Sequence, residues 1–360
     1  MKLLDRLQWD KFVPVLVVLT LLIGSFWNDK FLTTSNMTFL IQSIGEIMLI
    51  AFSMTFLIIA GEIDLSVSST AALSSCMLGF VWQHTSNIPL AVLSALAVGF
   101  VCGAINGLLV TKLGLQSLAV TIGTLALYRG LCFALLGDKQ LTPFSTSFTS
   151  LNFKGLFGTW VPYVTVPLVV FGLAFGVVLH ATRLGRWVYA IGQSKDAARF
   201  VGIPVQRTVL TLFITNGLMA GLAGVIYTIR FASARPDGAI GMELEVIAAA
   251  LFAGVSIFGG VGTMWAVAGS VAFLGSIRSL LRLNGANANE LTIVTGSLLL
   301  VSVVIPAIGP RISNRRHSHL HSPDAFEPAG ADLDRRDIAG DPPRSPAQEL
   351  SIPPTVPTRR

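Results

Sequence analysis

A short polar stretch, residues 61–69, interrupts the apolar first part of the chain with side chains that can hydrogen bond or carry charge. It contains Glu62, Asp64 and Ser66 between two apolar runs. Asp64 or Ser66 can cap the helix that follows by accepting hydrogen bonds from its free backbone N–H groups. Alternatively, a membrane span broken at this point would present the carboxylate and the hydroxyl to a water-filled path.

Further polar side chains lie within the next two apolar runs, where a charged group costs roughly 2.5 to 3.5 kcal/mol on insertion scales. Asn106 stands beside a row of glycines and suits an interhelical hydrogen bond. Arg129 either extends to the outer interface or lines an entrance for a polyhydroxylated or anionic solute. We predict that six residues line a translocation path: Asp64, Ser66, Asn106, Thr121, Thr124 and Arg129.

Motifs for catalysis and for metal binding are absent from the sequence. No Gly-Lys dipeptide occurs, so the glycine-dense break at 254–263 cannot be a nucleotide-binding loop of the Walker A type. Gly-x-Ser-x-Gly and His-Glu-x-x-His are also missing, and the three cysteines lie unpaired in apolar runs. We therefore expect no catalytic residue, no metal site, no cofactor and no ATPase activity of the chain's own.

The elements that must position these residues are membrane helices. Apolar residues make up 52% of the chain and charged residues only 12%, with a mean hydropathy of +0.70, which exceeds what a soluble domain tolerates. A span needs about 20 mostly apolar residues. We predict an all-α polytopic membrane bundle of about ten transmembrane helices, roughly at 12–27, 38–60, 67–83, 88–111, 116–136, 162–181, 208–229, 244–258, 264–281 and 291–309.

Domain organisation and orientation follow from where the charged residues gather. Residues 1–310 form the predicted transmembrane domain, and 311–360 form a Pro-rich, polar tail that we expect to be disordered and cytoplasmic. The first span has no cleavage site after it and is interpreted as a retained anchor. The bias of loop Lys and Arg places the N-terminus, the segment 182–207 and the tail inside a multi-pass protein of the cell membrane. No basic stripe with interleaved aromatics indicates a nucleic-acid partner.

The segment 182–207 is the one long polar island in the membrane part, with five basic residues against a single acid. Within it, Asp196, Ala197 and Ala198 are typical of the start of a short helix. Gly202, followed by Pro204, is typical of the end of that helix. We interpret this segment as a cytoplasmic knob that docks to a soluble partner.

Glycines spaced four apart predict close helix packing. Small residues at this spacing let two helix backbones approach each other in lipid. The residues concerned are Gly99, Gly103 and Gly107 in one span, Gly172 and Gly176 in another, and Gly217 and Gly221 in a third.

Taken together, these motifs resemble the permease subunit of bacterial ABC importers of the ribose, xylose and rhamnose type, the branched binding-protein-dependent permease family. The similar blocks occur in family order over about residues 12–309: 61–69, 103–107, 121–130, 190–203 and 259–265. The chain departs from the family pattern at Glu62 and Ser68, which replace glycines, at Val261, which replaces an Arg, and at Ser194-Lys195, which replaces Asn-Pro.

The resemblance implies a mechanism and partners. Two permease subunits, identical copies or paralogues, form the path for a monosaccharide or related small polyol. Two ATP-binding subunits dock inside, at Asp196, Ala197, Ala198 and Gly202, and a solute-binding protein delivers the cargo from outside. Two other interpretations remain open on the residues alone: a secondary transporter driven by an ion gradient, for which Glu46 is the one acid well within a span, and a membrane scaffold or receptor without a solute path.

Overall fold

A computed structural model describes residues 2–287, 289–294, 296–297 and 300, all within the compact unit Met1–Arg311. Most of the tenth predicted span, 291–309, and the predicted tail, 311–360, lie outside the described residues. The described part is helical, with two isolated backbone bridges and no strand among its residues. The prediction of an all-α polytopic bundle is confirmed.

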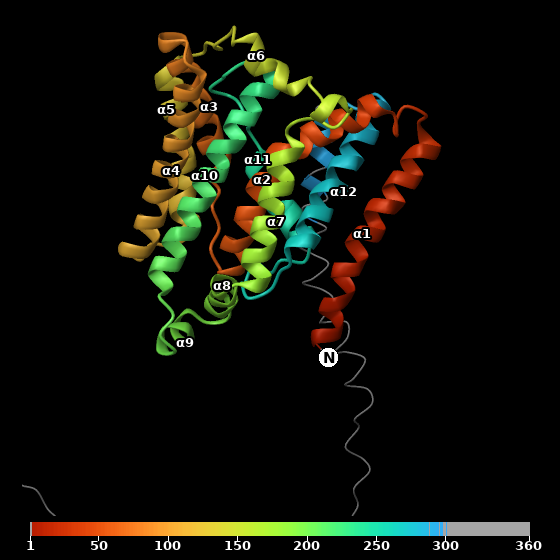
Figure 1. Cartoon of the computed structure of the whole chain (residues 1–360). Coiled ribbons are helices and arrows are strands. Elements are labelled where there is room, and N and C mark those ends of the chain that lie inside the picture. The colour runs from red at the N-terminus through yellow and green to blue at the C-terminus, as the bar shows by residue number, and fades with distance from the viewer. Residues whose placement is uncertain (1, 288, 295, 298–299, 301–360) are drawn as a thin grey trace, which may run out of the picture. The chain divides into compact units, whose positions relative to one another are not determined.

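Twelve α-helices and two 3-10 turns follow one another along the described residues (Figure 1). The first half of the chain contains α1 Lys2–Trp27, α2 Thr34–Ile59, α3 Val67–Thr85, α4 Ile88–Lys112 and α5 Ser117–Leu136. A connecting segment contains α6 Thr146–Thr149, η1 Ser150–Asn152 and η2 Leu156–Gly158. The second half contains α7 Thr165–Ala181, α8 Arg183–Gln193, α9 Lys195–Phe200, α10 Val205–Phe231, α11 Met242–Phe252 and α12 Met264–Leu283.

Helices occupy nine of the ten predicted spans, but they differ in length and hydropathy. Five of them, α2, α4, α5, α10 and α12, are long and apolar enough by themselves to cross a membrane, and α7 with α8 adds a sixth if this pair, bent by 67°, is one span. α11 has only 11 residues. At 1.5 Å per residue it reaches about half of the ~30 Å hydrocarbon core, so the predicted span 244–258 is a half-span followed by a loop.

The centre of the bundle is formed by α2 and α10. The apolar windows of α2 and α10 are 72% and 61% buried, against 28% for α4 and α5. Large apolar side chains are exposed on the outer helices, among them Leu93, Leu127 and Val170. Contact with lipid requires apolar side chains on the outside of the bundle. The polar residues are buried between the helices.

The glycine rows meet where α4 crosses α10. A Cβ added at Gly99 or Gly103 would collide with the backbone of α10 around Gly217, and a Cβ at Gly217 would collide with Gly99 and Gly103. Gly107 faces Phe213, while Gly221 packs on Ala95 and Gly99. Only glycine lets these two backbones touch. Gly172 and Gly176 lie elsewhere, against Phe52 and Trp265.

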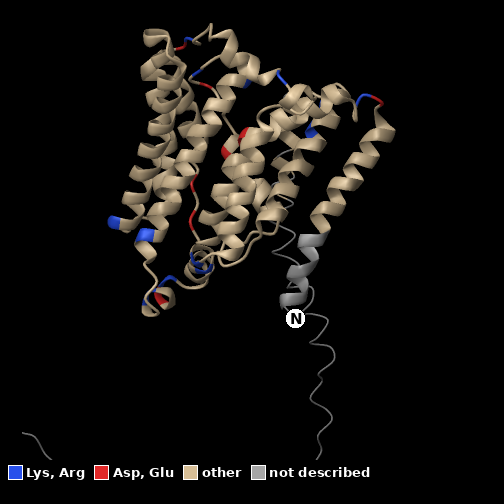
Figure 2. Cartoon of the chain, viewed as in Figure 1, with Lys and Arg blue, Asp and Glu red and all other residues tan. Residues whose placement is uncertain are grey.

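The two ends of the bundle differ in what they carry. The short helices α8 and α9 lie at one end, hereafter the α9 end, and α6 lies at the opposite end, hereafter the α6 end (Figure 1). Lys and Arg residues mark α8, α9 and the neighbouring helix ends at the α9 end, and others lie toward the α6 end (Figure 2). The helices alternate in direction, so α2 runs toward the α9 end while α10 and α12 run away from it.

Candidate functional site

The break between α2 and α3 begins at a glycine. Gly61 has φ of 78°, which L side chains rarely adopt, and its N–H donates to Ile58 O (3.0 Å) while the N–H of Glu62 donates to Leu57 O (2.9 Å). This pair of bonds closes the end of α2. The chain then runs extended through Asp64 until α3 starts at Val67, so the polar stretch predicted from the sequence is a non-helical passage between two helices.

Asp64 is the centre of a buried hydrogen-bond network in this passage. Its side chain is 2% exposed. One carboxylate oxygen accepts from Ser66 N–H (2.9 Å) and Ser66 Oγ (2.6 Å) and lies 3.5 Å from Asn106 Nδ2. The other oxygen accepts from Asn216 Nδ2 (3.0 Å). Ser66 Oγ also accepts from Asn106 (2.8 Å).

The network continues into two further helices, α2 and α5. Ser53 of α2 donates to Asn216 Oδ1 (2.8 Å), and Tyr128 of α5 donates to Asn106 Oδ1 (3.2 Å). Each amide therefore bridges the carboxylate to another helix. Because all its donors are neutral, Asp64 is held by hydrogen bonds without a cation, and the network fastens the passage to α2, α4 and α10.

Three residues of this network, Asn216, Ser53 and Tyr128, were not among the predicted site residues. A signal for Asn216 exists in the sequence: Asn216-Gly217 repeats the pattern of Asn106-Gly107, an asparagine beside a glycine of a packing face. Applying the Asn106 argument to both places would have found it. Nothing comparable distinguishes Ser53 from other serines in apolar runs.

The remaining predicted path residues take two different places. Thr121 is buried and donates to Ile63 O (3.3 Å), one residue from Asp64, and Thr124 follows on the next turn of α5. Arg129 lies away from them, near the α6 end, and donates to Pro236 O and Gly238 O (both 2.7 Å). Arg129 thus holds the loop between α10 and α11.

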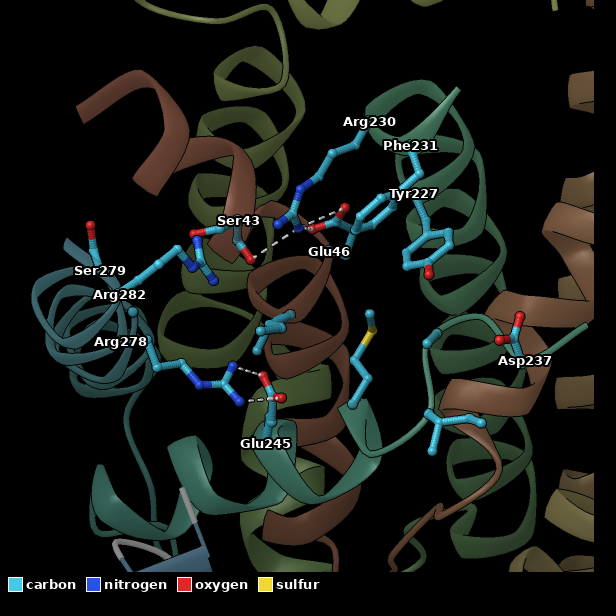
Figure 3. A pocket seen from close by; sticks show the side chains of 15 residues that line it. Ser43, Glu46, Tyr227, Arg230, Phe231, Asp237, Glu245, Arg278, Ser279 and Arg282 are labelled. Atoms are coloured by element: carbon cyan, nitrogen blue, oxygen red, sulfur yellow. Dashed lines mark hydrogen bonds and ion pairs between the residues drawn. The ribbon is translucent and has the colours of Figure 1, made fainter. Parts of the chain in front are cut away.

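A charged cavity of about 290 Å³ lies between α2, α10, α11 and α12, beside that loop (Figure 3). It lies in the half of the bundle nearer the α6 end, since Arg230 is in the last turn of α10 and Ser43 in the first half of α2. None of the six predicted path residues lines it. The lining residues are Ser43, Glu46, Ile47, Tyr227, Arg230, Phe231, Asp237, Ala239, Ile240, Met242, Glu245, Gly275, Arg278, Ser279 and Arg282.

Two ion pairs stand on opposite sides of the cavity. Arg230 donates through Nη1 to both oxygens of Glu46 (3.1 and 3.3 Å), whose side chain is 1% exposed. Arg278 makes a two-pronged pair with Glu245 of the half-span α11. Figure 3 shows the two pairs with the open space between them. Arg282 points its guanidinium over the ring of Phe39, 4.7 Å from the centroid.

The polar island predicted at 182–207 is built from α8, α9 and the turn before α10. α8 buries only one face, Gly185, Val188 and Ile191, and so lies on the surface of the bundle. Ser194 caps α9 by accepting from Ala197 N–H (3.2 Å). Gly202, with φ of 81°, ends α9.

The four predicted docking residues differ in exposure. Asp196, Ala197 and Gly202 are exposed, whereas Ala198 is 3% exposed and packs into the core. Asp196 is paired with Arg199 on the next turn (3.3 Å). Two large apolar side chains beside them, Phe200 and Val201, are 92% and 76% exposed. The end of α9 therefore protrudes from the bundle and exposes two apolar side chains to solvent.

The island is tied to the bundle at three points. Lys195 Nζ pairs with Glu62 of the α2–α3 passage (2.5 Å). Gly192 lies against Ile59 and Gly260, and Gly260 N–H donates to Ile59 O (2.8 Å). Tyr189 donates to Gly262 O (2.6 Å). Both non-helical passages, 60–66 and 253–263, therefore contact the island directly.

Groupings typical of metal sites are not found among the described residues, where no three His, Cys, Asp or Glu side chains gather. Cys76, Cys102 and Cys132 are buried free thiols.

Comparison with known proteins agrees with this arrangement. Residues 36–304 match a family described as branched-chain amino acid transport system / permease component. The chain is also 31% identical over 323 residues to the autoinducer 2 import system permease protein LsrD of Yersinia pseudotuberculosis and of Yersinia pestis, covering 88% of this chain and 95% of each relative. No solved structure matches the chain. The family resemblance predicted from the sequence is confirmed.

Proposed function

The chain belongs to the branched-chain amino acid transport system / permease component family, and on this premise we propose that it is the membrane-spanning subunit of an ATP-driven importer. In this proposal it passes a monosaccharide or related small polyol inward from a solute-binding protein. The observation that carries the proposal is the match over 36–304, which includes the buried network, the cavity and the polar island. The family assigns ATP hydrolysis to a separate subunit.

The partners follow from the two ends of the bundle. The α9 end carries the protruding, basic island and is the proposed cytoplasmic end, where the ATP-binding subunit docks at Asp196, Ala197 and Gly202. The α6 end then faces outward and receives the solute-binding protein. A second permease, as an identical copy or a paralogue, completes the path. The positive-inside rule supports this orientation in a bacterial cytoplasmic membrane.

The choice of a sugar-like solute is supported by the relatives. The Yersinia proteins are named for import of autoinducer 2 rather than of an amino acid. The charged, hydrogen-bonding character of the cavity also favours a solute with hydroxyl groups over an apolar one.

An ion-gradient-driven transporter is the main rival, and the environment of Glu46 counts against it. Acids that serve as ion sites in such transporters are exposed to the path and exchange their ion. Glu46 is instead engaged through both oxygens by Arg230.

The test is uptake of labelled monosaccharide by proteoliposomes that contain the full chain, with and without the ATP-binding subunit and the solute-binding protein. We expect accumulation only when both partners and ATP are present. Accumulation driven by a proton or sodium gradient, with the chain alone, would establish the rival. Partner binding without uptake in any combination would point to a scaffold or receptor.

A further inference from the structure

We propose that the charged cavity between α2, α10, α11 and α12 is a binding station for a small, neutral, polyhydroxylated solute. The inference rests on the proposed function, because it assigns the imported solute to a place in this chain. It concerns residues that the sequence patterns did not identify, apart from Glu46, and a site separate from the Asp64 network.

The charge of the lining favours a neutral solute. Three guanidinium groups, those of Arg230, Arg278 and Arg282, and three carboxylates line the cavity, so its formal charge is zero. Glu46 and Glu245 already carry guanidinium partners, and Asp237 has Arg235 at 3.6 Å. An amino acid is disfavoured because each of the three carboxylates that could bind its ammonium group is already paired with an arginine. A sugar phosphate is disfavoured because Arg230 and Arg278 are already neutralised by Glu46 and Glu245.

The hydrogen-bonding capacity of the lining favours hydroxyl groups. A hydroxyl both donates and accepts, so it binds best where N–H groups and carboxylate oxygens stand side by side. Each ion pair supplies this arrangement. Arg230 uses only one of its three nitrogens for side-chain pairing, and a paired carboxylate retains lone pairs for further donors.

Size and surface agree with a small polar molecule. A volume of about 290 Å³ lies at the lower end of pockets that hold small molecules, below the usual drug-sized range. Nine of the fifteen lining residues are polar or charged, whereas pockets for apolar ligands are lined mostly by apolar side chains. The rings of Tyr227 and Phe231, with centroids 4.5 Å apart, form one wall suited to the C–H face of a sugar ring.

Cysteine protection tests this assignment directly. Ser43 lines the cavity, and the native cysteines are all buried, so the thiol of a Ser43→Cys variant is the accessible one. The full importer in proteoliposomes is treated from outside with a membrane-impermeant thiol reagent. D-ribose, D-xylose, L-rhamnose, L-leucine and ribose 5-phosphate are tested singly as protectants. Ser147→Cys, an exposed position on α6 outside the lining, is the control.

We expect at least one neutral sugar to slow modification at position 43 by about threefold when present at twice its Kd, because the free fraction of the site falls to one third. Modification at position 147 should not change. Protection by leucine or by ribose 5-phosphate in place of the neutral sugars would overturn the solute class. Ile240→Cys, at an exposed lining position, repeats the measurement if the first variant folds poorly.

The same vesicles separate failure of the site from failure of the function. If the unmodified importer transports no sugar with ATP and both partners, the proposed function fails. If it transports a sugar that protects neither position 43 nor position 240, the function stands and the cavity is not the station. Absence of any modification at both positions would show that the cavity is closed to the outside, which also overturns the proposal.

Charge removal at the third arginine provides a second readout. Arg282→Gln leaves both ion pairs intact and keeps one donor amide. For a neutral sugar we expect the concentration that gives half-protection to rise by about fivefold, the effect of one lost hydrogen bond. An unchanged half-protection concentration would remove Arg282 from the site, and a loss restricted to ribose 5-phosphate would show that the cavity selects anions.

Discussion

Asp64 shows how a single buried carboxylate can organise a membrane protein without a counter-charge. Removing a carboxylate from water is costly unless its oxygens are satisfied. Here four donor groups surround it: two from Ser66 of the passage, one from Asn106 of α4 and one from Asn216 of α10. The carboxylate therefore joins the passage to α4 and α10 through hydrogen bonds to both of its oxygens.

Asn216→Ala should destabilise the protein by about 2 kcal/mol. Neutral hydrogen bonds between membrane helices contribute only about 0.6 kcal/mol on average, but bonds to a charged group contribute about 1.5 to 3 kcal/mol. Asn216 donates to Asp64 and accepts from Ser53, so its loss leaves both without that partner. Thermal unfolding in detergent measures the effect.

Thr215→Ala is the matched control for this substitution. Thr215 is the neighbouring residue on α10, and among the described residues its hydroxyl bonds only to Thr211 O within the same helix. Equal melting temperatures for the two variants would mean that the network contributes little to stability.

Sequence reasoning identified part of this network, for a physical reason. Polar residues at membrane depth must be explained, so Asp64, Ser66, Asn106 and Thr121 were recognisable by type. Asn216 is recognisable by the same argument as Asn106, but its pairing with Asp64 is not, since the two lie 152 residues apart in the chain and only the packing of α10 brings them together. Arg129 was predicted either to extend to the outer interface or to line an entrance, and in the structure its guanidinium donates to the 236–238 backbone.

At the scale of elements, the crossing of α4 and α10 depends on the absence of side chains. Gly217→Ala should cost about 1 to 3 kcal/mol of stability, because its Cβ would collide with the backbone of Gly99 and Gly103 and force the helices apart. Gly123→Ala is the control. Gly123 is also helical, but a Cβ there meets nothing within 4 Å, so that variant should be neutral or slightly more stable. Equal destabilisation of both would argue against a tight crossing.

The pair Lys195–Glu62 joins two positions at which the chain departs from the family pattern. Glu62 is buried, with 6% of its side chain exposed, while Lys195 is 43% exposed and partly screened by solvent. Lys195→Ala leaves a buried carboxylate without its cation. We expect a loss of about 1 kcal/mol, well below that of a fully buried pair because of this screening.

Removing both charges distinguishes this pair from a surface contact. The double variant Glu62→Gln with Lys195→Ala should be more stable than Lys195→Ala alone, since no charge is left unpaired. Chemical denaturation of all four members of the cycle gives the coupling energy. A coupling of zero would show that the two side chains act independently.

The ends of elements were harder to predict than their existence. Hydropathy over windows of about 20 residues locates apolar helices well. It does not reveal that α11 stops after 11 residues, because the apolar composition continues into the loop that follows it. Gly254 marks the stop through its φ of 81°, a conformation that a pattern of apolar residues cannot show.

At the scale of the whole molecule, the cavity and the polar island lie toward opposite ends and are connected through the centre. The island contacts the 60–66 passage at Glu62 and the end of α2 at Ile59, and the passage is fastened to α2, α4 and α10 by the Asp64 network. α2 and α10 in turn supply Glu46 and Arg230 to the cavity. A displacement of α9 can therefore be transmitted to the helices that line the cavity through a continuous series of packed contacts.

Ala197→Trp is expected to separate ATP hydrolysis from uptake in the assembled importer. Ala197 is exposed, so the large ring does not disturb the core, unlike a substitution at the buried Ala198 or at Gly202 with its positive φ. If α9 docks on the ATP-binding subunit, the ring holds the two surfaces apart and uptake falls about tenfold or more, a coupling loss of at least ~1.4 kcal/mol. ATP hydrolysis by the partner should stay within about twofold.

Lys112→Trp provides the comparison that makes this result specific. Lys112 is exposed at the end of α4, outside the segment 182–207, so a ring there tests the general effect of a bulky surface group at the same end of the bundle. We expect uptake with this variant to equal that of the unmodified chain, measured with the same labelled sugar and the same partners. Normal uptake by Ala197→Trp would exclude α9 from docking, and equal losses in both variants would trace the effect to assembly in the membrane rather than to coupling.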